Sequence, residues 1–370
     1  MIIGVPKEVK PQEFRIALTP HGAAELIKSG HQVLVERNGG TGAGFTDNEY
    51  ESVGAQVVAS AAEIWAASEM IVKVKEPQPS EYPLMRKEQL LFTYLHLAAS
   101  RECTDALLQS GISSIAYETV TVAGQLPLLA PMSEVAGRLA PQVGAYALQK
   151  ASGGSGILLG GVPGVRPAKV LVLGGGVAGT EAARIAHGMG AHVQIVDRNI
   201  NRLKELSIMF SGNVETIYST SAVIEELALE ADLIIGAVLI RGDKAPKLIS
   251  NSLVSRMKPG TVLVDIAIDQ GGCFEGSKPT THADPTYKVH ETLFYCVANM
   301  PGAVPRTSTL ALTNATLPYL LQLANKGLVG ALSTSEPLQA GLTTHGGALY
   351  CPEVGHALNL PVRDIHELIG

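Results

Sequence analysis

The sequence predicts an α/β fold with two doubly wound domains, one of them inserted into the other. Two observations support this prediction. A short unit recurs along the chain, in which an amphipathic helix ends at a glycine and a β-branched strand follows. A glycine just past a helix adopts the left-handed cap, and helices alternating with strands at this spacing are typical of parallel sheets covered by helices. In addition, two long helical stretches flank a complete second series of such units.

The recurring unit is found four times. Its helix, glycine and strand fall at Ala23–Ser29, Gly30 and His31–Glu36; at Tyr50–Val53, Gly54 and Ala55–Val58; at Thr104–Ser110, Gly111 and Ile112–Tyr117; and at Ala182–Met189, Gly190 and Ala191–Asp197. Helix-start signals agree with two of these positions. Thr19 is a capping residue followed by proline at the first helical position, and Ser100 precedes the helix predicted over Cys103–Gln109.

The two long helical stretches, 133–150 and 307–326, are predicted to connect the domains. The first begins at Ser133, a capping residue, and Glu134 suits the positive end of the helix dipole. Each stretch contains a proline, Pro141 in the first and Pro318 in the second, and an interior proline predicts a kink.

These connectors define the predicted domains. The first is discontinuous and covers 1–128 and 306–370, and the inserted domain covers 129–305. Ligands are expected between two such domains. The weakly periodic tail after Gly330 is expected to pack on the first domain or at a subunit contact.

Composition excludes several classes of protein. The 370 residues include 28 Lys and Arg against 34 Asp and Glu, a net charge of −6. No block of five like charges indicates a nucleic-acid or polybasic membrane surface, and no apolar run reaches the roughly 18 residues of a membrane span. The first residues lack a secretory signal, and the four cysteines lack metal-ligand spacing. We expect a cytoplasmic globular protein with reduced thiols and no structural metal ion.

The segment 169–179 predicts a dinucleotide site in a strand–turn–helix context. Gly174 would permit the tight turn, Gly176 would let the backbone approach a pyrophosphate, and Gly179 would let the helix pack against the strand. Asp197 closes the next strand, 21 residues after Gly176, where an acceptor for a ribose 2′-hydroxyl is expected. A carboxylate there favours NAD over NADP, although the arginine that follows could receive a 2′-phosphate.

Composition and periodicity indicate no substrate. Six separated motifs carry a resemblance to a known family. They are Glu8…Phe14-Arg15, Val72–Pro77, Phe92–Ala98, Ala130–Arg138, Asp265–Gly272 and Val297–Gly302. In this order, and over essentially the whole chain, they resemble the alanine dehydrogenase family. The resemblance implies NAD-dependent interconversion of L-alanine with pyruvate and ammonium, a catalytic domain split around a Rossmann domain, and a homohexamer.

The resemblance also implies four residues of the chemistry. Arg15 and Lys75 match the substrate-binding pair of the family, and His96 and Asp269 match its acid–base residues. Arginine suits the substrate carboxylate, and a lysine can stabilise charge on the 2-oxo oxygen. A histidine titrates near neutrality, and the aspartate could orient ammonium or share the proton relay. Without the resemblance, a core histidine, solvated surface cations and a turn-capping aspartate remain alternatives.

A larger set is implied for the cofactor. It comprises Ser133, Gly174, Gly176, Val177, Ala178, Gly179, Asp197, Arg202, Ser219, Val238, Leu239, Ile266, Ala267, Ile268, Asp269, Val297, Ala298, Asn299 and Met300. Arg202 could pack on the adenine, offset phosphate charge or remain a surface cation on its helix. The long, polar, aperiodic segment Phe274–Glu291 is expected to be a loop that covers the cofactor.

Two other functions stay open. The NAD(H)-binding subunit of proton-translocating transhydrogenase resembles the same two domains, but its pattern has glutamine in place of Lys75 and an Arg-Gln-Asp loop that this chain lacks. A related enzyme acting on larger substrates, of the saccharopine or lysine-forming type, would differ by a larger substrate pocket.

Overall fold

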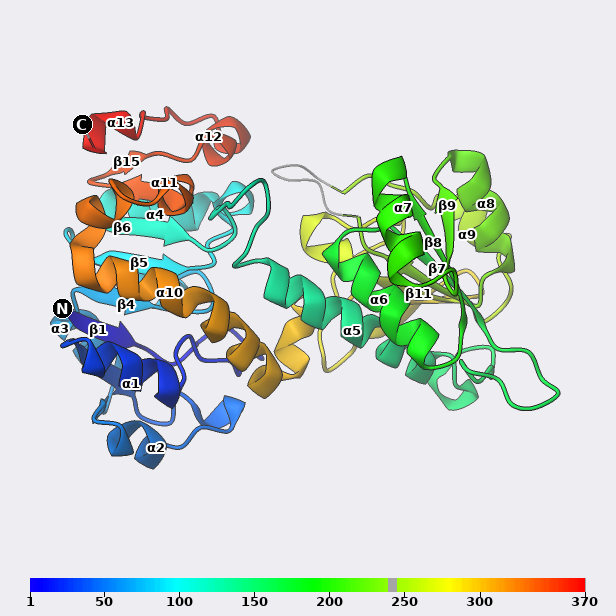
Figure 1. The fold of residues 1–370 in the computed structure, drawn as a ribbon, viewed down its shortest axis with the longest axis horizontal. Coiled ribbons are helices and arrows are strands. Elements are labelled where there is room, and N and C mark those ends of the chain that lie inside the picture. The colour runs from blue at the N-terminus through cyan, green and yellow to red at the C-terminus, as the bar shows by residue number, and fades with distance from the viewer. Residues whose placement is uncertain (239–244, 370) are drawn as a thin grey trace. The chain divides into compact units, whose positions relative to one another are not determined.

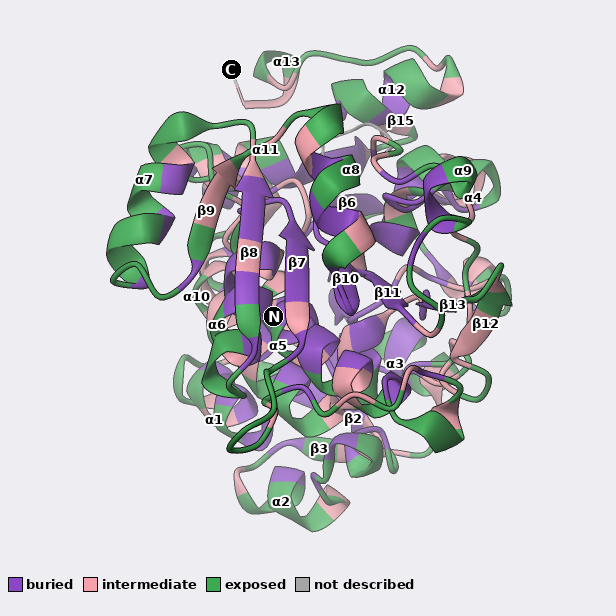
Figure 2. Cartoon of the chain, turned by 90° about the vertical axis from the view of Figure 1, so that its right-hand side faces the viewer, coloured by how far each residue is buried: buried purple, intermediate pink, exposed green. Residues whose placement is uncertain are grey.

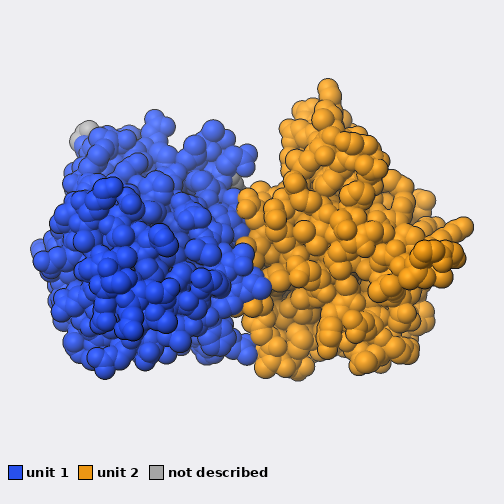
Figure 3. Space-filling view, turned by 60° about the horizontal axis from the view of Figure 1, so that its bottom comes forward, with its two compact units in different colours: residues 1–132, 304–370 blue, residues 133–303 orange. Residues whose placement is uncertain are grey.

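Two mostly parallel sheets organise the chain, as Figure 1 shows for a computed structural model that describes residues 1–238 and 245–369. The chain divides into two compact units, Met1–Met132 with Val304–Gly370, and Ser133–Ala303 (Figure 3). We call them unit 1 and unit 2. The sequence predicts these divisions at 128/129 and 305/306. The predicted α/β class is confirmed, because each unit is a sheet with its own helices.

Unit 1 contains an eight-stranded sheet in the order β15-β14-β6-β5-β4-β1-β2-β3. Its strands are β1 (Ile2–Val5), β2 (Gln32–Glu36), β3 (Gln56–Val58), β4 (Met70–Val72), β5 (Leu90–Thr93), β6 (Ser113–Ala116), β14 (Leu342–His345) and β15 (Ala348–Leu349). The first six are parallel, and the strand order reverses direction between β1 and β4. β14 pairs antiparallel with β6, so the tail after Gly330 packs on the first domain, which is one of the two places expected from the sequence.

The helices of unit 1 are α1 (Pro20–Lys28), α2 (Asp47–Ser52), α3 (Ala61–Ala67), α4 (Arg101–Ser110), α10 (Pro305–Leu332), α11 (Glu336–Gly341), α12 (Pro352–Leu358) and α13 (His366–Ile369). Five of them, α1, α2, α3, α4 and α11, begin at a Ser or Thr whose side chain caps the helix. The hydroxyl of Thr19 accepts from the Gly22 N–H and that of Ser100 from the Cys103 N–H, so both predicted caps are confirmed. α10 is longer than predicted and is broken at Gly327, where φ is 66°.

Unit 2 contains a seven-stranded sheet in the order β12-β13-β11-β10-β7-β8-β9. Its strands are β7 (Lys169–Leu173), β8 (His192–Asp197), β9 (Glu215–Tyr218), β10 (Leu233–Gly236), β11 (Val262–Asp265), β12 (Thr286–Val289) and β13 (Thr292–Tyr295). All are parallel except β12, and the order reverses between β7 and β10. β7 is buried apart from Lys169, as expected of a central strand covered on both faces, and half of β8 is buried (Figure 2).

One predicted loop is partly wrong. β12 lies inside the segment predicted as a loop, Phe274–Glu291, and pairs antiparallel with β13 at the sheet edge. The same segment is tied down by bridges from Phe274 to Ile249 and from Thr280 to Val297. An edge strand that is half-exposed carries little periodic signal, so only its pairing partner identifies it.

The helices of unit 2 are α6 (Val177–Gly188), α7 (Ile200–Met209), α8 (Ser221–Glu230) and α9 (Asn251–Val254), together with most of α5 (Ala130–Ala147). The prediction that Ser133 caps its helix is wrong. α5 begins at Ala130, and Pro131 occupies its first turn, where a missing N–H costs nothing. Ser133 therefore lies within the helix.

All four cysteines are buried and free. Across 1–238 and 245–369, no helix combines the length and apolar character needed to cross a bilayer.

Candidate functional site

The glycine-rich turn after β7 has the conformation that a phosphate-binding turn needs. Gly174 has φ of 99°, a region that favours glycine, and a Cβ on Gly179 would lie 1.8 Å from the Gly174 carbonyl oxygen. At Gly176, by contrast, an added Cβ would meet no atom within 4 Å. Gly176 is the N-cap of α6 and offers no side-chain cap to its first N–H groups. This open space at a bare helix N-terminus fits a dinucleotide pyrophosphate.

Asp197 and Arg202 form hydrogen bonds with the two backbone groups of Gly175, in the middle of this turn. The Asp197 carboxylate accepts from the Gly175 N–H at 2.7 Å and from the Asn199 N–H at 2.8 Å. The Arg202 guanidinium donates to the Gly175 carbonyl at 2.7 Å and to the Thr180 hydroxyl at 2.8 Å. The carboxylate therefore stands beside the glycine-rich turn, which is the place expected of a ribose acceptor.

Ser133 lies on α5, and most of the other residues predicted for the cofactor lie at one edge of the unit 2 sheet. They follow the carboxyl ends of successive parallel strands, with Ser219 after β9, Val238 after β10, Ile266–Asp269 after β11 and Val297–Met300 after β13. Ligands of open α/β sheets bind at this edge, at the point where the strand order reverses. Leu239 lies outside the described residues.

The residues of this set differ in how far their side chains are buried. The side chains of Ala267, Ile268, Val297 and Met300 are buried in the core of unit 2, so these positions could reach a cofactor only through their backbone. Asp269 is exposed on the short 3₁₀ turn Ile266–Gln270. Among the four residues predicted for the chemistry, it alone lies in unit 2.

Arg15, Lys75 and His96 come to the corresponding edge of the unit 1 sheet. They follow β1, β4 and β5, respectively, and β1 and β4 are the neighbours between which the strand order reverses. The Thr93 hydroxyl donates to the Lys75 carbonyl at 2.9 Å, which joins the ends of β4 and β5. The structure therefore brings these three residues, far apart in sequence, to one sheet edge.

Arg15 is held in a fixed orientation. Its side chain is 2% exposed, and Glu13 accepts from Nε at 2.7 Å and from Nη2 at 2.5 Å. Burial lowers the pKa of Arg15, but the hydrogen bond and charge of Glu13, together with Tyr94 and Glu8, raise it above its ordinary value, so the guanidinium stays charged. The Arg15 Nη1 also donates to the Met132 sulfur at 3.0 Å.

Lys75 lies beside a second buried ionic group. Lys73 is fully buried between Glu8, at 3.2 Å, and Glu81, at 2.9 Å. The other Glu8 oxygen accepts from the Val74 N–H at 2.6 Å, so this group fixes the strand end that carries Lys75.

His96 has the left-handed backbone conformation, with φ of 50°. Its ring stacks on Tyr94 with centroids 5.8 Å apart, and 46% of its side chain is exposed. The Glu118 carboxylate accepts from the His96 N–H at 2.6 Å. An imidazole with this exposure is accessible to a substrate, whereas a core histidine would be enclosed.

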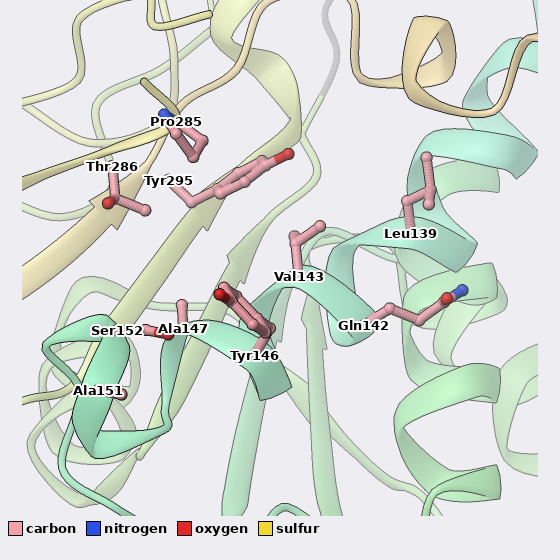
Figure 4. A pocket seen from close by; sticks show the side chains of 10 residues that line it. All are labelled: Leu139, Gln142, Val143, Tyr146, Ala147, Ala151, Ser152, Pro285, Thr286 and Tyr295. Atoms are coloured by element: carbon pink, nitrogen blue, oxygen red, sulfur yellow. The ribbon is translucent and has the colours of Figure 1, made fainter. Parts of the chain in front are cut away.

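Unit 2 also has a hollow of about 400 Å³ that is separate from the predicted cofactor residues. Figure 4 shows it lined by one face of α5 together with Pro285, Thr286 and Tyr295. None of the residues predicted for substrate or cofactor lines it. Within the described residues, no group of three His, Cys, Asp or Glu side chains is arranged to hold a metal ion.

Two family models match the chain. Residues 4–136 match the N-terminal domain of alanine dehydrogenase/PNT, and residues 140–352 match its C-terminal domain. The chain belongs to the alanine dehydrogenase/PNT family. The resemblance inferred from six sequence motifs is confirmed.

Relatives within this family match over the full length. The alanine dehydrogenase of Mycolicibacterium smegmatis is 58% identical over 371 residues, covering 100% of both chains, and that of Bacillus subtilis is 56% identical, covering 94% of this chain and 92% of the relative. Among solved structures, an L-alanine dehydrogenase is 55% identical with a TM-score of 0.94, covering 97% of this chain and 99% of its own. A transhydrogenase from Sinorhizobium meliloti is 26% identical with a TM-score of 0.81, covering 95% and 99%.

Three side chains that hold predicted site residues in place were not identified from the sequence. Glu13 orients Arg15, Glu118 bonds the backbone of His96, and Thr180 accepts from Arg202. The position of Glu118, just beyond a predicted parallel strand, was a usable signal. The other two carry none, because their roles depend on contacts made only in the folded chain.

Proposed function

We propose that this chain catalyses the NAD-dependent oxidative deamination of L-alanine to pyruvate and ammonium, and the reverse reductive amination. The observation that carries this proposal is the 58% identity to an alanine dehydrogenase over the whole of both chains. Alanine dehydrogenase activity, and with it the class of oxidoreductase, follows from that identity. The roles of individual residues rest on their places at the two sheet edges.

In this proposal, unit 1 holds the substrate. The Arg15 guanidinium binds the carboxylate that alanine and pyruvate share. Lys75 donates to the 2-oxo oxygen and stabilises negative charge that builds on it. His96 gives and takes the proton when water adds to the iminium and when ammonia leaves the carbinolamine. Asp269 orients the ammonium or shares that proton relay.

The edge of unit 2 would hold NAD. The N–H groups at the start of α6 would meet the pyrophosphate, and Asp197 would accept from the ribose hydroxyls. Arg202, Ser133 and the backbone after β9, β10, β11 and β13 would complete the site. When bound, NAD accepts the hydride from the alanine Cα.

Assembly and location are part of the same proposal. Several large apolar side chains of unit 2 are exposed, among them Tyr146 at 66%, Leu158 at 65% and Val165 at 63%. Apolar surface of this kind supports a homo-oligomer, and the family resemblance implies a hexamer. A cytoplasmic location agrees with four free thiols.

An NADH oxidation assay tests the proposal. Purified protein is mixed with pyruvate, ammonium and NADH, and absorbance of the reduced nicotinamide is followed, with 2-oxoglutarate or glyoxylate replacing pyruvate in parallel. We expect oxidation that requires both pyruvate and ammonium. NADH binding without oxidation would overturn the proposal and favour a transhydrogenase-type module, which resembles the chain at 26% identity.

A further inference from the structure

The backbone at His96 is held in a conformation that it would not adopt unaided. A φ of 50° at a residue with a Cβ is uncommon and is maintained only where the surroundings impose it. Here one side chain supplies that restraint. Both Glu118 oxygens accept from the Leu95 N–H, at 3.1 and 3.2 Å, and Oε1 also accepts from the His96 N–H at 2.6 Å.

The carboxylate is itself fixed by the sheet. Glu118 follows β6, which pairs in parallel with β5, and the Tyr117 N–H donates to the Thr93 carbonyl at 2.9 Å. The Tyr117 ring packs edge-on against Tyr94 with centroids 5.0 Å apart, and the Tyr94 hydroxyl donates to the Leu128 carbonyl at 2.5 Å. Since His96 stacks on Tyr94, ring and backbone are restrained from two directions.

The Glu118 side chain also lies on the imidazole side of the turn. Its Oε1 is 4.0 Å from Nδ1 of His96, which is too far for a hydrogen bond. Only 17% of the Glu118 side chain is exposed.

We propose that Glu118 is a positioning residue for His96. By accepting from two successive N–H groups it holds the left-handed turn that presents the imidazole. This inference rests on the proposed acid–base role of His96. Glu118 acts through His96 and need not touch the substrate.

A double-mutant cycle tests this role. Glu118→Ala is expected to lower kcat about 10- to 100-fold, the usual effect of misplacing a reacting group by about 1 Å. The dissociation constant of NADH is expected to stay within about twofold, since NADH is assigned to unit 2. In a His96→Ala background the same substitution is expected to cost little more, because the group that it positions is already absent.

The conservative variant separates positioning from general destabilisation. In Glu118→Gln the remaining carbonyl oxygen can still accept from the His96 N–H, so we expect kcat to recover to within about tenfold of the parent. Glu25→Ala, which removes an exposed carboxylate from α1, is the matched control and should leave kcat unchanged. If Glu118→Ala does not fold, Glu118→Asp replaces it in the cycle, because its carboxylate stops one methylene short of the turn.

The kcat values of the variants distinguish a wrong role for Glu118 from a wrong role for His96. If His96→Ala lowers kcat and the Glu118 variants do not, or if their losses simply add, the role of Glu118 is wrong and the proposed function stands. If His96→Ala itself leaves kcat unchanged, the acid–base assignment is wrong, and the positioning role is overturned with it.

Discussion

Polar side chains near the two sheet edges form hydrogen bonds with backbone groups of the adjacent turns. The Asp197 carboxylate bonds the N–H groups of Gly175 and Asn199, and Arg202 bonds the Gly175 carbonyl. Glu118 does the same for Leu95 and His96. A substitution at Asp197 or Arg202 therefore removes support for a turn together with any ligand contact, and controls must separate the two effects.

At His96, the expected effect is on chemistry alone. His96→Ala should lower turnover by about 10²-fold or more, the usual contribution of a positioned acid–base group. The backbone N–H that donates to Glu118 is retained in alanine, so NADH binding should be unchanged. The quenching of protein fluorescence measures that binding. Loss of NADH binding would mean that the histidine is structural.

At Asp197, the expected effect is on cofactor choice. Asp197→Ala should reduce the preference for NAD over NADP about tenfold or more, equivalent to about 1.4 kcal/mol, because the carboxylate that repels a 2′-phosphate is gone. The ratio of kcat/KM for the two cofactors measures this. Asp197→Asn keeps one acceptor oxygen for the Gly175 N–H, so it should show the same change in preference with a smaller loss of binding. An unchanged ratio in both variants would remove Asp197 from the ribose site.

At the scale of elements, α6 depends on close backbone approach at its first turn. A Cβ on Gly137 would lie 2.3 Å from the Ala178 carbonyl oxygen, so α5 also packs against the start of α6. Gly137 and Gly179 therefore allow the N-terminus of α6 to pack closely against α5 and against the turn after β7. A shift there would move the N–H groups assigned to the pyrophosphate.

Two alanine substitutions within α6 test this packing. Gly179→Ala should abolish measurable NADH binding and lower the melting temperature of unit 2, because the new Cβ would meet the Gly174 carbonyl oxygen. Gly188→Ala, at the other end of the same helix, would meet no atom within 4 Å and should stabilise by up to about 1 kcal/mol. Calorimetry and NADH titration of both variants measure the contrast. Equal behaviour would contradict it.

The ionic group around β4 predicts a pH dependence of stability. Lys73→Met leaves Glu8 and Glu81 buried without their cation, and breaking such a group costs about 3–5 kcal/mol. Burial already raises the pKa of Glu8 above its ordinary value of 4.5, against the opposing effect of Lys73. Removing Lys73 raises it further. A carboxyl with a raised folded-state pKa stabilises the fold below its unfolded pKa and loses that contribution as pH rises through the folded value.

The loss in Lys73→Met should therefore be smallest below about pH 4.5 and should grow as the pH rises. Urea unfolding of parent and variant across this range measures the difference in unfolding free energy. Lys28→Met, on the exposed end of α1, is the control. A difference that does not vary with pH would show that the two carboxylates stay uncharged or find other partners.

At the scale of the whole molecule, each unit repeats one arrangement. A parallel sheet reverses its strand order once, and the residues predicted for the chemistry and for NAD follow the carboxyl ends of its strands. Exposed apolar side chains are found on another part of unit 2, along α5 and the segment after it. That surface is where assembly is expected.

Assembly is open to a direct measurement. Light scattering should give a mass that is a multiple of one chain, and Leu158→Glu should lower it, because a charge would then be buried at the contact. Ile208→Glu is the matched control, since Ile208 is 70% exposed on α7 and does not line the hollows along α5. A parent protein with the mass of one chain would overturn the oligomer.

The sequence by itself determined the class of fold, the glycine-rich turn and the family. Periodicity, caps and glycines are local signals, and Lys169–Leu173, Thr19 and Ser100 were placed correctly because short-range physics decides them. The start of α5 was misplaced at Ser133, since Pro131 and a serine two residues later are both acceptable starts in isolation.

Only the tertiary structure decided which side chains share an edge and which partners they have. Strand order brings Arg15 and Lys75 to one sheet edge, pairs β12 with β13, and sets Glu118 against the His96 N–H. These contacts join residues distant in the chain, and their energy depends on burial and pairing rather than on the identity of neighbours in sequence. A lone glutamate is usually solvated, so its function as a backbone acceptor is decided only when the sheet brings it to the turn.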